Sequence, residues 1–94
     1  MSETPNSRPS ILLEADKAVN GDRQDDYGHP KINHTRTAEM WSSFLGVKIT
    51  PEQVCMMNIL QKVSRSSHMI TRDGLVDIAG YALNVEMIQN EENP

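Results

Sequence analysis

The sequence predicts an all-α fold, a small bundle of about four helices. Apolar residues recur at spacings of three and four positions in separate stretches of the chain, as they do on one face of an amphipathic helix. Residues that start and stop helices bound these stretches. The length of 94 residues suits one domain with a modest core, so we expect a single helical domain over residues 10–90.

The first helix is expected to begin at Ser10, whose hydroxyl can cap it. Its apolar face consists of Ile11, Leu12, Ala15, Ala18 and Val19. We expect Gly21 to end this helix in the left-handed conformation. Beside the apolar face, Glu14 forms either a surface ion pair with Lys17 or a metal or ligand contact. Residues 1–9 show no apolar periodicity and are expected to be a disordered arm.

The stretch from Gly21 to Asn33 is interpreted as a loop, because Gly, Pro, Asp and Asn favour turns and local side-chain bonds. It also brings an aromatic ring, Tyr27, close in sequence to an imidazole, His29. Either the loop rims a polar binding site, or it is an ordered connector. His29 can act as a base or a phosphate donor, although a hydrogen bond that stabilises the loop is commoner.

The second helix is expected to begin after Asn33, a good N-cap, and to end at Gly46. Its apolar stripe includes Trp41 and Phe44. Because both rings fall on that stripe, we expect them in the core or in a subunit interface and not stacked on a base.

The third helix has the strongest start signal in the chain. Thr50 can cap it, Pro51 suits its first turn, and Gln53 stands at the capping-box position. Seven of ten consecutive residues are apolar, namely Val54, Cys55, Met56, Met57, Ile59, Leu60 and Val63. A helix that is apolar over most of its circumference is buried on several sides, and in so short a chain a second subunit is the expected cover. We therefore expect a homo-oligomer.

A polar break from Ser66 to Arg72 precedes the fourth helix, which is expected from about Asp73 to Gln89. Gly74 and Gly80 each cost about 1 kcal/mol inside a helix relative to Ala, and close approach of another backbone would offset that cost. Residues 91–94 are acidic and are expected to form a flexible tail.

The few polar residues of the third and fourth helices form two stripes. One consists of Asn58, Lys62 and Arg65, and the other of Asp73, Asp77, Tyr81 and Asn84. Helices joined by a short connection pack antiparallel, so we expect the stripes to share a cleft. Asp77 lies inside an apolar run, where a carboxylate needs a partner. It can pair with Lys62 or Arg65, face a ligand, or bind a divalent metal ion.

Several segments resemble an uncharacterised family of short helical proteins from phages and prophages. The most specific are DYGHP at residues 26–30 and VDIAGYA at residues 76–82, and the resemblance covers residues 11–88. The helical arrangement is also remotely similar to the MazG-like all-α nucleotide pyrophosphohydrolases, which gather carboxylates from two helices around Mg²⁺. Where those enzymes carry Glu-Glu-x-x-Glu and Glu-x-x-Asp, this chain has only Glu14 and a Gly74-x-x-Asp77.

Composition excludes several other classes of function. A net charge of −4 argues against DNA or RNA binding, which needs a basic face. No apolar run approaches the roughly 20 residues of a spanning helix, and no signal peptide is visible, so we expect neither membrane insertion nor secretion. Cys55 stands alone, which fits a reducing cytoplasm, that of the host cell if a phage encodes the protein.

The leading hypothesis is therefore a homo-oligomeric phage protein that binds a phosphorylated nucleotide without catalysis or a cofactor, for example to sequester a host signalling nucleotide. The residues expected at the ligand are Lys62 and Arg65 for phosphate, Asp73, Asp77 and Asn33 for sugar or base edges, Tyr27 or Tyr81 for stacking, and His29 in the lid. The alternatives are a Mg²⁺-dependent MazG-like pyrophosphohydrolase and a protein that inhibits a host factor through its apolar surface.

Overall fold

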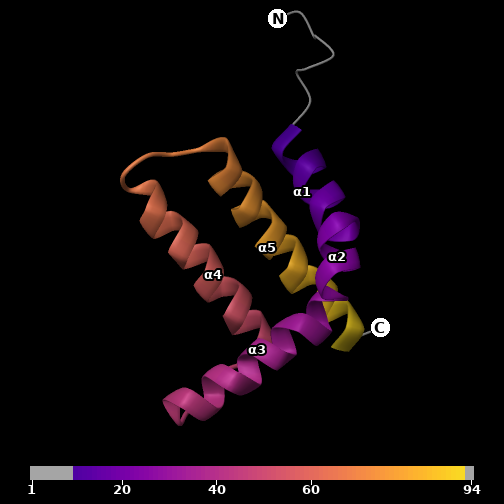
Figure 1. Cartoon of the computed structure of the whole chain (residues 1–94), viewed down its shortest axis with the longest axis vertical. Coiled ribbons are helices and arrows are strands. Elements are labelled where there is room, and N and C mark those ends of the chain that lie inside the picture. The colour runs from indigo at the N-terminus through magenta and orange to yellow at the C-terminus, as the bar shows by residue number, and fades with distance from the viewer. Residues whose placement is uncertain (1–9, 93–94) are drawn as a thin grey trace, which may run out of the picture.

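In the computed structural model, the described residues are 10–92, and they are all-helical with no strand, as the sequence predicted (Figure 1). The helices are α1 (Ser10–Asn20), α2 (Asp22–Tyr27), α3 (Pro30–Leu45), α4 (Pro51–Ser66) and α5 (Arg72–Glu92). Four of them match the predicted helices, and the six-residue α2 is additional. The predicted arm of residues 1–9 and the last two residues of the predicted tail lie outside this range.

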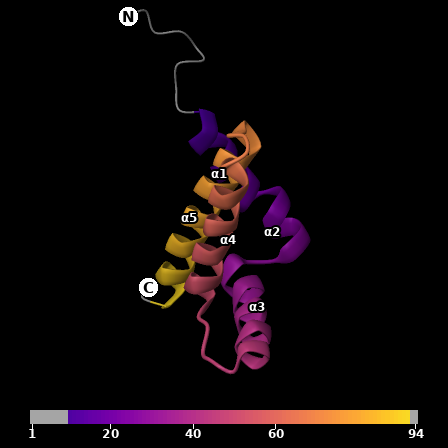
Figure 2. The same cartoon turned by 90° about the vertical axis from the view of Figure 1, so that its left-hand side faces the viewer.

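The long helix α5 lies between α4 and α1. Helix α3 crosses the α4–α5 pair near the end that is away from the α4–α5 connection (Figures 1 and 2). Small aliphatic residues and one cysteine from these four helices form the core: Ala15, Val19, Ala38, Val54, Cys55, Val76 and Ile88. Gly80 lies against α1, because a Cβ there would be 3.4 Å from Cγ2 of Val19. The close neighbour of this glycine is thus a side chain and not the backbone that the sequence suggested.

The prediction of a loop from Gly21 to Asn33 is wrong. This segment contains α2 and the first turn of α3. Gly21 has φ −121° and ψ −103°, so it is not a left-handed cap, and the chain turns directly into α2. The N-cap of α3 is His29, not Asn33. Its Nδ1 accepts a hydrogen bond of 3.1 Å from the backbone N–H of Lys31, and Pro30 fills the first helical position, where an N–H is not needed.

The start and end signals of the other helices are confirmed. Gly46 ends α3 at φ 73°, in the left-handed region. Thr50 and Gln53 form the capping box, with the Gln53 N–H donating to Thr50 Oγ1 at 3.2 Å and the Thr50 N–H donating to Gln53 Oε1 at 3.0 Å. At the other end of the chain, α5 continues to Glu92, so residues 91 and 92 are helical rather than part of a tail.

Large apolar side chains are exposed on several helices. Phe44 is 89% exposed, so the expectation that it lies in the core is wrong for the single chain. Trp41 is only partly buried, at the wall of the cavity described below. None of the described helices combines the length and the apolar character that crossing a membrane requires.

The capping box of α4 gives a testable prediction. Thr50→Ala removes the side-chain acceptor for the Gln53 N–H, and we expect it to lower the free energy of unfolding by about 1 kcal/mol. Urea denaturation followed by circular dichroism measures the change. Ser43→Ala, at an exposed position inside α3, serves as the control and should not destabilise the protein. Equal stability of Thr50→Ala and the natural protein would contradict this role.

Candidate functional site

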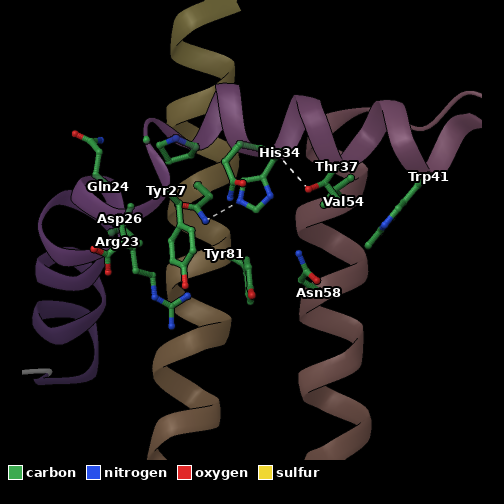
Figure 3. Close-up of a pocket in the computed structure, with 15 residues that line it drawn as sticks. Arg23, Gln24, Asp26, Tyr27, His34, Thr37, Trp41, Val54, Asn58 and Tyr81 are labelled. Atoms are coloured by element: carbon green, nitrogen blue, oxygen red, sulfur yellow. Dashed lines mark hydrogen bonds between the residues drawn. The ribbon is translucent and has the colours of Figure 1, made fainter.

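A cavity of about 590 Å³ lies among α2, α3, α4 and α5, with Val19 of α1 also in its lining (Figure 3). Three aromatic rings line it: Tyr27 from α2, Trp41 from α3 and Tyr81 from α5. Each ring comes from a different helix, so the cavity exists only when these helices are assembled. The 6.2 Å between the ring centres of Tyr81 and His34, with an interplanar angle of 65°, is an edge-to-face contact.

Side-chain amides from three helices also line the cavity. They are Asn33 on α3, Asn58 on α4 and Asn84 on α5. Within residues 10–92, the amides of Asn33 and Asn58 make no hydrogen bond, so their donors and acceptors are available to a bound molecule. An asparagine amide offers two donors and one carbonyl acceptor, which is the complement of many heterocyclic edges.

A buried polar pair closes one side of the cavity. His34 and Asn84 are 6% and 7% exposed, and the Asn84 Nδ2 lies 3.2 Å from the His34 Nε2. Burial lowers the pKa of His34 below its usual value of 6.5, so the ring is neutral at pH 7 and its Nε2 accepts the hydrogen bond. The Asn84 Oδ1 is buried without a partner among the described residues. This pair links α3 to α5 through a buried hydrogen bond.

An ion bridge borders the cavity on another side. The Asp77 Oδ2 lies 2.9 Å from the Lys62 Nζ, and the Asp77 Oδ1 accepts a 2.9 Å hydrogen bond from the Arg23 Nη2. The pairing of Asp77 with Lys62 was one of the alternatives that the sequence left open. Arg23 was not foreseen, because it lies 54 residues away in sequence. We call these three residues the Asp77 bridge.

The residues predicted for one cleft are divided between two hollows. Tyr27, Asn33 and Tyr81 line the cavity. A smaller hollow of about 360 Å³, near the α4–α5 connection, is lined by the other stripe residues, namely Lys62, Arg65, Asp73 and Asp77. Asn58 and Tyr81 stand one helical turn from Lys62 and Asp77 respectively, so the Asp77 bridge lies between the two hollows. The two stripes therefore face each other, as the sequence predicted, but they line two hollows and not one cleft.

His29 lines neither hollow. Its Nδ1 caps α3, and its Nε2 lies 4.0 Å from the Glu91 Oε1 on α5. The commoner alternative for this residue, a hydrogen bond that stabilises the local chain, is the one found.

Other lining residues were missed or given different roles. The predicted stripes include Asn58 and Asn84, but neither was predicted to contact the ligand. Their positions on the same stripes as Lys62 and Tyr81 could have indicated that they line the site. Trp41 was interpreted as core or interface. For Arg23 and His34 the sequence carries no signal, since only the packing of α2 and α3 against α5 brings them to the cavity.

Two carboxylates, Glu14 on α1 and Asp77 on α5, are held in ion pairs with basic side chains. The sequence suggested an ion pair between Glu14 and Lys17. In the structure Glu14 pairs with Arg72 instead, at 2.7 Å. Asp77 is bound in its bridge. In the region from residue 10 to residue 92, no three His, Cys, Asp or Glu side chains gather in a way that could hold a metal ion.

Comparison with known proteins reveals the family of the chain. A family model described as a domain of unknown function, DUF6378, matches residues 10–89. The chain belongs to this family. It is similar to the Gene 55 protein of Mycobacterium phage L5, with 44% identity over 86 residues, which are 89% of this chain and 55% of the relative. The Gene 55 protein of Mycobacterium phage D29 is 39% identical over 83 residues, which are 87% of this chain and 55% of that relative.

The chain thus spans about half the length of the relatives that it matches, 55% in both cases. No solved structure matches it. The predicted membership of an uncharacterised family with phage members is confirmed. The remote likeness of this DUF6378 domain to MazG-like enzymes stays a prediction.

The lowered pKa of His34 predicts how stability changes with pH. Because the folded protein holds this ring neutral below its usual pKa of 6.5, the unfolded chain takes up the proton first as the pH falls. The free energy of unfolding should therefore decrease from pH 6.5 downward, until the lower pKa of the folded state is reached. Urea unfolding at pH 7.5, 6.5 and 5.5 measures this slope.

Two variants test the assignment of that slope. His34→Gln cannot titrate and should lose the decrease, whereas His68→Gln changes an exposed ring and should keep it. An unchanged slope in His34→Gln would show that another group causes it.

Proposed function

We propose that this protein binds a nucleotide, with the base in the cavity and the phosphate at Arg23. The observation that carries the proposal is the convergence of three aromatic rings and the unengaged amides of Asn33 and Asn58 on one cavity. A nucleobase has flat faces that stack on aromatic rings and edges that pair with amide donors and acceptors. The volume of about 590 Å³ lies within the range of small-molecule sites.

Arg23 supports a phosphate at the wall of the cavity. Its guanidinium carries five N–H donors, and the Asp77 bridge takes up one of its nitrogens. Lys62 balances the charge of Asp77, so the bridge as a whole carries one net positive charge; the carboxylate of Asp26 also lines the cavity. A planar, permanently charged group with free donors is well suited to a phosphate. Arg65, the other predicted phosphate ligand, lines the smaller hollow together with two carboxylates and has no part in this arrangement.

Binding is favoured over hydrolysis. A Mg²⁺-dependent pyrophosphohydrolase needs several convergent carboxylates to hold one or two hard cations. Here Glu14 and Asp77 are each paired with arginine or lysine, and they lie in different parts of the fold. In a phage, a protein that holds a nucleotide without turning it over would lower the free concentration of a host signalling molecule.

Calorimetry tests the proposal. The panel contains nucleosides, nucleoside monophosphates and triphosphates, and cyclic dinucleotides. We expect heat with at least one phosphorylated compound, and Asn58→Ala should weaken that binding about tenfold because one hydrogen bond to the base is lost. The matched control is Asn90→Ala, an exposed asparagine on α5 that does not line the cavity. Absence of heat with every compound would refute nucleotide binding.

The role of Arg23 gives a separate prediction. Arg23→Gln removes the charge at the cavity wall, so affinity for a nucleotide should fall about tenfold or more while affinity for the matching nucleoside changes little. Comparing the two ligands on the same variant cancels any general loosening of α2. If both affinities fall equally, Arg23 holds the cavity together and does not contact phosphate.

A further inference from the structure

The outer face of α4 differs from the exposed faces of the other long helices. Its exposed apolar residues are Met56, Leu60 and Val63, at 51%, 64% and 52% exposure. In Figure 2, α4 lies in front of α5, and no other helix covers the side turned to the viewer. The face is therefore apolar, open and belongs to a helix of 16 residues, which is about 24 Å long.

The spacing on this face is that of a helix-pairing seam. Apolar and small polar residues follow one another at intervals of three, four, three and four: Gln53, Met56, Leu60, Val63 and Ser67. This is the a/d pattern of two heptads, the pattern by which one helix packs along another. Inside the chain, Gln53 is engaged in the capping box with Thr50 and Ser67 bonds to Ser64, at the two ends of the seam. The apolar residues between them, Met56, Leu60 and Val63, stay more than half exposed.

The seam is also free of charge. Within about 60° of Leu60 around the helix axis there is no Lys, Arg, Asp or Glu. By contrast, the exposed surfaces of the other long helices carry charged residues, such as Glu14 and Asp16 on α1 or Arg36 and Glu39 on α3. When a surface packs against its own copy, like charges that lie opposite each other repel. This face carries no charged residue, so two copies can pack together without that repulsion.

The order of residues makes the seam self-complementary. Leu60 lies at its centre, apolar residues flank it on both sides, and an uncharged polar residue stands at each end. If two antiparallel copies cross at Leu60, Met56 of one copy meets Val63 of the other, and Gln53 meets Ser67. A twofold axis through Leu60 requires this kind of matching, because each surface must fit itself.

Exposed apolar residues next to both ends of α4 can enlarge the contact. Phe44 and Val47 precede its first turn, and Met69 and Ile70 follow its last; all four are more than half exposed. In an antiparallel pair, the residues after α4 of one copy lie near those before α4 of the other. A single helix crossing falls short of the roughly 800 Å² per partner of a stable interface, and these flanks supply more area.

We propose that a second copy of this chain occupies the outer face of α4, in an antiparallel helix pair centred on Leu60. This inference concerns a surface and does not depend on nucleotide binding. Sedimentation equilibrium should give twice the chain mass. Leu60→Glu would place two carboxylates together on the axis and raise the dissociation constant about 100-fold or more. Circular dichroism would show that its fold persists, since Leu60 is 64% exposed.

The control Leu12→Glu alters an equally exposed leucine on α1, with 60% exposure, and should leave the dimer intact. A monomer at every concentration of the natural chain would overturn the proposal and leave the face to another protein. A dimer that Leu60→Glu does not weaken would overturn it as well.

Disulfide crosslinking tests the antiparallel geometry. The native Cys55 is fully buried, and burial together with nearby Glu52 raises the pKa of its thiol to about 12, so it gives little background. Under air with copper phenanthroline, Leu60→Cys should crosslink with itself. Met56→Cys should crosslink with Val63→Cys in a mixture but poorly with itself, because two Met56 positions lie about 12 Å apart along the axis. Efficient self-crosslinking of Met56→Cys would indicate a parallel pair and refute the arrangement.

Discussion

The Asp77 bridge is the interaction on which the cavity depends. A helix of six residues such as α2 is too short to be stable by itself, and its side chains contribute nothing to the apolar core. The contact between Arg23 and Asp77 links α2 to α5, while Lys62 links α4 to the same carboxylate. One acidic residue in an apolar helix therefore ties together three of the helices that line the cavity.

The same carboxylate shows how far sequence reasoning reaches. Its partner on α4 was predictable, because a short connection makes α4 and α5 antiparallel neighbours and a carboxylate in an apolar run needs a cation. Its partner on α2 was not, since no local pattern links residues 54 positions apart. Local signals such as the Thr50 capping box and Gly46 were read correctly because the few residues around them determine the structure. The two glycines and the proline of the 21–33 segment predicted a loop, but each of them stands at a helix terminus.

The division of the predicted site into two hollows changes the chemistry expected of the protein. The stripes suggested a charged cleft in which basic and acidic residues meet a ligand together. In the folded chain Lys62 and Asp77 neutralise each other, and the adjoining cavity offers rings and amides instead. The binding proposed for such a space would rely on stacking and hydrogen bonds to an uncharged heterocycle, with Arg23 and Asp26 as the charged groups beside it. A net charge of −4 is compatible with that arrangement, because one local cation suffices for a small anion.

The two sides of α4 connect the cavity to the outer seam. Asn58 and Leu60 are two residues apart, so they point about 160° away from each other around the helix. A partner on the Leu60 side would therefore leave the cavity open to the proposed ligand. It would also hold α4 against a second helix, so the wall that carries Asn58 and Lys62 would be less free to move. Pre-organised donors bind more tightly than mobile ones, because less conformational entropy is lost on binding. Packing on the apolar outer face of α4 would thus favour binding at its polar inner face, although the two faces share only the helix itself.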